Sequence, residues 1–488
     1  MSSENNVQQI TGSAKMVTIT PVFQVFQPYG ILNSQRITTI TDTGGTVTSD
    51  TSNGVEISLD ITTSSGSFAT LRSARVLKYR PGLSNSIRFG MTFATPVANS
   101  LQYGGLSNEG SQISFAYVGT DFVIRKLTDG HLEVRTLTIT AAETGAATAT
   151  VTLDSVAFAV TLSNAGGALS FTAHELEIFT YAGWDVEHVN DTITFVSNDI
   201  IAGPLTGTFS YSSTGASTGT FARTKAGVVV TETTVSQADW NSNSEMITLL
   251  DPTLFNTYEI EYSWLGGGNI DFRVLNPRDG KYETVHSIQT ANTGVGVSLS
   301  QPNMYGEVSL SSVGSTTAMT VSVSGLMGGT YGPVHVKTPI YAISNERTIA
   351  ANTETVVLVV HDRHSINGYV NQSEILINHL SGAADGNRAV LIKMIKNPTT
   401  LSANTTGDYA NNQYVNELES ISIVDTESLT YTGGNIIDEF FIGKNGNLDV
   451  TYDSDRQIEL FQSEAIILTA FSTATNTVNL SMSLLEDH

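Results

Sequence analysis

Apolar and polar positions alternate through most of the chain, and the segment 258–264 shows the pattern clearly. Its even-numbered positions are aromatic or aliphatic, and its odd-numbered positions are glutamate or serine. A period of two is that of a β-strand with one buried face. We therefore expect Trp264 to belong to a hydrophobic core, and Glu259 and Glu261 to share the opposite face.

Three glycines, Gly266–Gly268, follow this strand. Apolar alternation resumes over 270–274, a turn with proline and glycine covers 276–280, and a third alternating run covers 282–288. A phosphate-binding loop would need a helix after the glycines and a Gly-Lys-Ser/Thr sequence, and neither is present. The pattern predicts a β-meander in which the glycines form a bend.

Similar short runs separated by turn residues extend along the rest of the chain, which predicts an all-β protein. We expect a concanavalin-A-like β-sandwich with a small inserted α+β module, followed by a C-terminal jelly-roll-like β-sandwich. The predicted parts are a flexible N-terminal arm at 1–14, a discontinuous sandwich at 15–135 and 226–339, the module at 136–225 and the C-terminal domain at 340–488.

One helix is expected in the module, at about 172–181. Thr172 and Glu175 have the T-x-x-E spacing of a capping box, and Leu176 and Phe179 would lie on one side of the helix. The module is therefore expected to place one helix on a sheet.

Charge and composition reduce the number of functions that the chain could have. The formal net charge is -23, which disfavours nucleic acid as a partner. The chain has no cysteine, so disulfides and thiolate chemistry are excluded. We expect no membrane span, because no apolar run reaches the roughly 20 residues required. The first fifteen residues lack the apolar core of a signal peptide, so no secretion signal is expected.

Five basic residues crowd the stretch 72–88: Arg72, Arg75, Lys78, Arg80 and Arg88. They could be edge-strand charges that prevent sheet-to-sheet aggregation, or one half of an internal ion-pair network. We prefer both interpretations to a nucleic-acid patch, because the chain as a whole is acidic.

Glu259 and Glu261 are the best candidates for catalysis. Alternate residues of a strand are about 7 Å apart, within the range of roughly 5–9.5 Å that separates glycosidase carboxylates. The same face carries no further carboxylates or aromatic platforms, so a polar outer face, or an ionic contact with the stretch 72–88, is the preferred interpretation. We expect no enzyme activity and assign no catalytic residue.

The most metal-like cluster is the run His361, Asp362, Arg363 and His364. On a strand, positions 361 and 364 point to opposite faces, so we interpret the run as a solvated strand end. The acidic turns at 42–50 and 189–199 could hold calcium, although solvated turns are the preferred interpretation. No metal and no cofactor are assigned.

The run 71–93 contains an arginine-rich strand followed by a Tyr-Arg-Pro-Gly turn, and the run 97–126 contains the aromatic strand Phe-Ala-Tyr-Val-Gly-Thr. With the segment 249–288, they resemble sequences of virion proteins of large DNA viruses and tailed phages. The C-terminal runs 384–399, 430–444 and 478–487 are similar to a terminal domain of the same proteins. The chain departs from the family's pattern at 361–373, and Leu485 replaces its final tryptophan.

The resemblance covers most of the chain. It implies a structural virion protein at the particle surface, such as a minor capsid, vertex, fibre or tail-fibre subunit that contributes to host attachment. The implied partners are further copies of the chain, most plausibly in a trimer, other virion proteins and host surface glycans. The implied location is the virion, after synthesis in the host cytoplasm. A carbohydrate-binding module and a glycoside hydrolase that acts on host polysaccharide stay open as alternatives.

Overall fold

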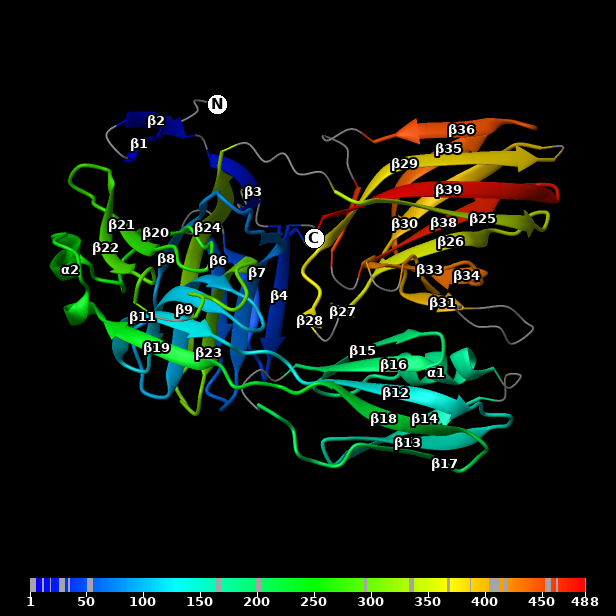
Figure 1. The fold of residues 1–488 in the computed structure, drawn as a ribbon, viewed down its shortest axis with the longest axis horizontal. Coiled ribbons are helices and arrows are strands. Elements are labelled where there is room, and N and C mark those ends of the chain that lie inside the picture. Colours follow the sequence, from blue (N-terminus) through cyan, green and yellow to red (C-terminus); the bar gives the residue numbers. More distant parts are fainter. Residues whose placement is uncertain are drawn as a thin grey trace. The chain divides into compact units, whose positions relative to one another are not determined.

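The computed structural model divides into two compact units (Figure 1). The first comprises Met1–His131 and Val229–Val336, and the second comprises Leu132–Val228 and Lys337–His488. The structure describes residues 6–10, 13–17, 19–25, 31–33, 36–50, 56–163, 168–198, 203–293, 296–332, 338–366, 369–386, 388–402, 413–416, 419–452, 458–461 and 464–487.

Two antiparallel sheets form the described part of the first unit's sandwich. One sheet has the order β19 (Thr231–Ser236), β11 (Asp121–Thr128), β10 (Gln112–Val118), β9 (Ser100–Ser107), β23 (Met304–Ser312), β7 (Phe68–Leu77) and β4 (Ile37–Asp42). The other has the order β22 (Tyr282–Ile288), β21 (Ile270–Leu275), β20 (Asn256–Tyr262), β8 (Asn85–Thr92), β24 (Met319–Tyr331), β6 (Glu56–Ile61) and β5 (Thr46–Asp50), with β3 (Ile19–Val25) also paired to β24.

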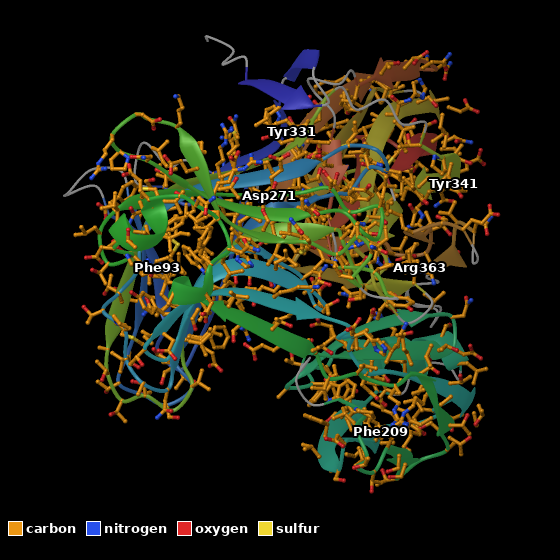
Figure 2. The ribbon with its side chains drawn as sticks, turned by 60° about the vertical axis from the view of Figure 1, so that its left-hand side comes forward. Phe93, Phe209, Asp271, Tyr331, Tyr341 and Arg363 are labelled. Carbon is orange, nitrogen blue, oxygen red and sulfur yellow. The ribbon has the colours of Figure 1, made fainter. Side chains whose placement is uncertain are left out.

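Aromatic side chains fill the core between these sheets. The ring centroids of Phe115 and Tyr258 are 4.9 Å apart. Phe93, labelled in Figure 2, packs edge-on against Tyr117 and Phe122 at 5.6 and 5.3 Å. Strands from both segments of the discontinuous unit contribute to this single core, so neither segment can bury its apolar face without the other.

The β-meander predicted around the three glycines is confirmed as β20, β21 and β22, and no helix follows the glycines. Gly268 donates its backbone N–H to the carbonyl of Trp264 at 2.7 Å. A Cβ at position 268 would overlap the carbonyl oxygen of Ser263, so the bend requires a glycine there.

The expectation that Trp264 is a core residue was wrong in part. The strand ends at Tyr262, so the alternation no longer governs position 264. Trp264 is half-buried at the edge of the core, where its indole N–H donates to the carbonyl of Leu299 at 3.0 Å.

The module between the two segments of the sandwich has two sheets and one helix in its described part. The sheets have the orders β15 (Trp184–Val189), β16 (Thr192–Ser197), β12 (Val134–Ala141), β18 (Thr218–Lys225) and β14 (Val156–Leu162), β13 (Ala147–Leu153), β17 (Ser210–Ser213). Helix α1 (Leu169–Glu177) packs on the first of these sheets and against β14, through Ala173 and Leu176.

The predicted capping box was wrong. The helix begins three residues earlier than expected, its N-cap is Ala168, and no side chain caps it. Thr172 lies inside the helix, and its hydroxyl accepts a hydrogen bond from the backbone N–H of Glu143 at 3.0 Å. Glu175 accepts the backbone N–H of Ser163 at 2.8 Å. Both side chains therefore bind neighbouring loops instead of the helix end.

The C-terminal part of the second unit is a sandwich of two antiparallel sheets around its own aliphatic core. In the described residues, one sheet has the order β25 (Ile340–Ile349), β39 (Asn476–Asp487), β29 (Glu374–Asp385) and β36 (Asn447–Thr451), with β37 (Ile458–Leu460) paired to β29. The other has the order β32 (Gln413–Tyr414), β33 (Ser422–Asp425), β26 (Thr355–Asp362), β38 (Ala465–Phe471), β30 (Val390–Lys396) and β35 (Asn435–Ile442).

The remaining described elements are small. Three two-stranded sheets pair β1 (Asn6–Ile10) with β2 (Ser13–Val17), β27 (Ser365–Ile366) with β28 (Tyr369–Val370), and β31 (Thr400–Ser402) with β34 (Thr430–Thr432). The helical pieces are η1 (Gln237–Asp239) and α2 (Met246–Leu249).

The predicted all-β sandwich fold is confirmed by these antiparallel sheets. The division into four parts at the predicted boundaries, and the flexibility expected of the N-terminal arm, stay predictions. Within the described ranges, no helix is both long and apolar enough to cross a membrane.

Candidate functional site

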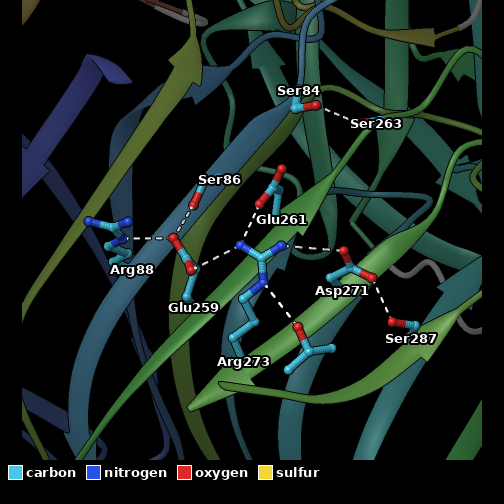
Figure 3. Close-up of polar contacts among 10 residues, drawn as sticks. Ser84, Ser86, Arg88, Glu259, Glu261, Ser263, Asp271, Arg273 and Ser287 are labelled. Atoms are coloured by element: carbon cyan, nitrogen blue, oxygen red, sulfur yellow. Dashed lines mark hydrogen bonds and ion pairs between the residues drawn. The ribbon is translucent and has the colours of Figure 1, made fainter. Parts of the chain in front are cut away.

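Strand register places the candidate glutamates beside arginines in a charged row (Figure 3). Glu259, at the middle of β20, pairs directly with Arg88 on β8 and with Arg273 on β21. Because directly opposed residues of antiparallel strands project to the same face, the three side chains form a line across the sheet. The core lies on the opposite face, where Ile260 and Phe272 are buried.

Both carboxylate oxygens of Glu259 have protein partners. Oε1 accepts from Arg88 Nε at 2.7 Å and from the Ser86 hydroxyl at 3.1 Å. Oε2 lies 3.4 Å from Arg273 Nη1. The whole residue is only 1% exposed. A carboxylate engaged in this way is held in place and shielded from a substrate.

Arg273 also lies between the remaining acids of the row. Its Nη1 forms an ion pair with Glu261 Oε2 at 2.6 Å. Its Nη2 is 3.4 Å from Asp271 Oδ2, and the other oxygen of Asp271 accepts the Ser287 hydroxyl at 2.6 Å. The Arg273 guanidinium thus forms ion pairs with three carboxylates.

The electrostatics of the row follow from this arrangement. Burial raises the pKa of Glu261, Arg273 opposes the rise, and the negative charges of Glu259 and Asp271 add to it. Burial alone would lower the pKa of Arg88, but Glu259 raises it above its ordinary value. Raised carboxyl pKa values occur both in catalytic acids and in structural ion-pair networks.

The contacts of Glu259 are those of a structural ion-pair network. A glycosidase acid must reach the glycosidic oxygen, whereas Glu259 is enclosed by Arg88, Ser86 and Arg273. The ionic contact predicted between the glutamates and the stretch 72–88 is confirmed by the Arg88–Glu259 pair.

A second row lies on the other sheet of the same sandwich. Arg72 on β7 is opposite Glu307 on β23, and Arg72 Nε lies 2.5 Å from Glu307 Oε2. Tyr103 on β9 donates its hydroxyl to the other oxygen of Glu307. Arg72 and Arg88 therefore confirm the interpretation of the basic stretch as half of an internal ion-pair network.

The metal-like run 361–364 lies at the end of β26. The expectation of a solvated strand end was wrong for Asp362 and Arg363, which are 1% and 8% exposed, whereas His361 and His364 are half-buried. Arg363 is labelled in Figure 2. Asp362 accepts the amide of Asn371 at 2.6 Å, and Arg363 donates to the carbonyl of Ser420 at 3.1 Å. These two buried residues therefore serve packing in the C-terminal sandwich.

Three groups in the module that the sequence pattern did not single out lie together: His174, Glu177 and His188. Among the described residues, this is the set of histidines and acids whose ligand atoms are close enough to share a metal ion. The spacing His174-x-x-Glu177 on a predicted helix was an available signal. The position of His188 follows only from the packing of the helix on the sheet.

No family model matches the chain, and no curated protein matches its sequence. Among solved structures, the chain is similar to a chain of Sulfolobus turreted icosahedral virus, at 8% identity and a TM-score of 0.17, over 95% of this chain and 98% of that one. It is also similar to the VP2 subviral particle of infectious bursal disease virus, at 10% identity and a TM-score of 0.13, over 84% and 81% of the two chains. Scores this low carry no argument, and none of the conclusions below depends on them.

Proposed function

We propose that this chain is a structural virion protein at the particle surface, a minor capsid, vertex, fibre or tail-fibre subunit that contributes to host attachment. It assembles as a homo-oligomer, a trimer, and also contacts other virion proteins. Its four parts are the arm 1–14, the sandwich 15–135 and 226–339, the module 136–225 and the C-terminal domain 340–488.

The observation that carries the proposal is the position of the residues behind the sequence resemblance. The arginine-rich strand is β7, the following turn is closed by a hydrogen bond from Leu83 N–H to the Arg80 carbonyl at 3.0 Å, and the next strand is β8. Arg72 and Arg88, on either side of that turn, make the buried pairs of the two sheets. The recurring sequence elements thus stabilise a rigid sandwich, as a scaffold requires.

Edge strand β35 supports assembly with further copies. It ends the order of its sheet in the described residues, and it exposes Ile436 at 54% and Phe441 at 74%. An exposed edge with large apolar side chains favours pairing with another chain. Phe441→Ser should lower the mass of the assembly measured by light scattering, whereas Val156→Ser, at an exposed position of the module, should leave it unchanged.

Antibody labelling of purified virions under the electron microscope tests the proposal. We expect label at vertices, fibres or a tail tip. Unlabelled particles, with the chain recovered only from the soluble lysate, would contradict the virion assignment. They would favour the alternatives, a carbohydrate-binding module or a glycoside hydrolase.

A further inference from the structure

Two imidazoles and one carboxylate converge between the helix and the sheet of the module. His174 and Glu177 are three residues apart on α1, so both side chains lie on one helical face. His188 lies on β15, against which α1 packs. Their ligand atoms all lie within 4.8 Å of one another.

The carboxylate is positioned by its two oxygens separately. Glu177 Oε1 accepts the backbone N–H of His188 at 3.1 Å. Oε2 lies 2.7 Å from His188 Nδ1 and 3.4 Å from His174 Nδ1. The backbone contact fixes the carboxylate, and the second oxygen is left facing both rings.

These distances suit a small divalent metal ion. Zinc binds histidine nitrogen and carboxylate oxygen at about 2.0–2.2 Å, which separates neighbouring ligand atoms of a tetrahedral site by about 3.4 Å. The His174–Glu177 distance already has this value. The His188–Glu177 distance has to widen by less than about 1 Å, which a side-chain rotation provides.

Burial leaves one side of the cluster accessible. The His188 side chain is fully buried, whereas the side chains of His174 and Glu177 are 14% and 21% exposed. Oxygen Oε2 of Glu177 faces both imidazoles and can bind a cation between them, and a water molecule can reach the fourth position.

We propose that His174, Glu177 and His188 form a binding site for a divalent transition-metal ion, with Zn²⁺ the best match to the donor set. The bound ion fastens α1 to β15 and stabilises a module that has no disulfide. This inference departs from the sequence expectation of no metal. It does not depend on the proposed virion role.

The experiment uses the full-length chain after treatment with a chelator. Calorimetric titration with ZnCl2 at pH 7.5 is expected to show one site per chain, although the chain has 9 histidines. At pH 5 the binding should weaken, because protons compete for the imidazoles. Co²⁺ should give the visible absorption of a tetrahedral site.

His174→Ala is the decisive variant, because it removes one ligand and leaves the His188–Glu177 contact in place. It should weaken zinc binding at least about tenfold and abolish the zinc-dependent rise in Tm. His379→Ala is the matched control: His379 pairs with the exposed Asp449 at 2.7 Å, and among the described residues this pair has no third metal ligand within reach. Its zinc affinity should equal that of the wild type.

Two results would overturn the proposal. One is the absence of saturable zinc binding to the wild-type chain, which would leave Glu177 and His188 as an ion pair only. The other is zinc binding that His174→Ala leaves unchanged. His188 is fully buried, so it is not substituted in this test. Circular dichroism confirms that His174→Ala and His379→Ala are folded.

Discussion

The sandwich and the inserted module stabilise buried carboxylates in different ways. In the sandwich, Glu259 lies between Arg88 and Arg273, whose guanidinium charges persist at every accessible pH. In the module, Glu143 has no arginine partner among its described contacts and accepts hydrogen bonds from main-chain N–H groups and serine hydroxyls instead. The first arrangement depends on a matched charge, and the second depends on the ionisation of the acid itself. Stability of the two regions should therefore respond differently to mutation and to pH.

The largest effect is expected for Glu259→Gln in the sandwich. It leaves Arg88 half-buried without its counter-charge and removes one of the three carboxylates that pair with Arg273. Breaking a buried pair by removing one partner costs about 3–5 kcal/mol. Urea unfolding measures the loss. The matched control is Glu232→Gln, which breaks the 2.6 Å contact with Arg125 at a side chain that is 44% exposed. The control should cost less than about 1 kcal/mol. Equal losses would refute the structural role of the buried row.

A smaller loss is expected for Glu143→Gln in the module. The backbone N–H of Ala216, together with Ser213 and Ser217, lowers the pKa of Glu143 to about 2. Hydrogen bonds to a charged group contribute about 1.5–3 kcal/mol, and an amide cannot accept all of them.

The sign of the pH dependence follows from the lowered pKa of Glu143. Its contribution is complete above the ordinary pKa of 4.5 and is lost as the pH falls towards 2. The difference in unfolding free energy between wild type and Glu143→Gln should therefore be smaller at pH 3 than at pH 7. A gap that is unchanged at pH 3 would contradict this explanation.

The smallest effect, of opposite sign, is expected for Asp362→Asn in the C-terminal sandwich. Burial, and then the negative charges of Glu187 and Glu486, raise the pKa of Asp362 well above its ordinary value. The folded state therefore holds this proton more tightly than the unfolded state, and stability falls as the pH rises through the raised pKa. The amide cannot ionise, so the variant should be more stable than wild type by about 1 kcal/mol at pH 8.

Asp425→Asn provides the control for that prediction. Asp425 is equally buried, but its Oδ1 accepts the backbone N–H of Glu427 at 2.7 Å and of Ser428 at 3.2 Å. The substitution should destabilise the chain, because it weakens contacts to a carboxylate. Destabilisation by both substitutions at pH 8 would show that Asp362 is ionised in the folded protein.

The comparison also shows what the sequence could predict. Alternation over 258–262, 270–274 and 282–288 was sufficient to predict the meander and to place Glu259 on the outer face, because both depend on a period of two within each strand. The pairing of Glu259 with the stretch 72–88 could be anticipated from charge. Its specific partner, Arg88, could be identified only from the register of β8 against β20.

Elsewhere, local sequence patterns did not predict the side-chain contacts, because the hydrogen-bond partners come from distant segments of the chain. Thr172 and Glu175 have the spacing of a capping box, yet Glu143 and Ser163 offered them contacts that the helix end did not. The same packing brings His188 to Glu177. No spacing within one element encodes such a contact, so sequence reasoning missed the cluster.

The proposed function makes this chain a building block of a virion. The most direct measurement purifies particles from cells that produce the chain, washes them at high salt, and quantifies its peptides against isotope-labelled standards. The account predicts a fixed copy number above one in each particle, retained through the wash. Particles that lack the chain, with all of it in the soluble fraction, would contradict the account.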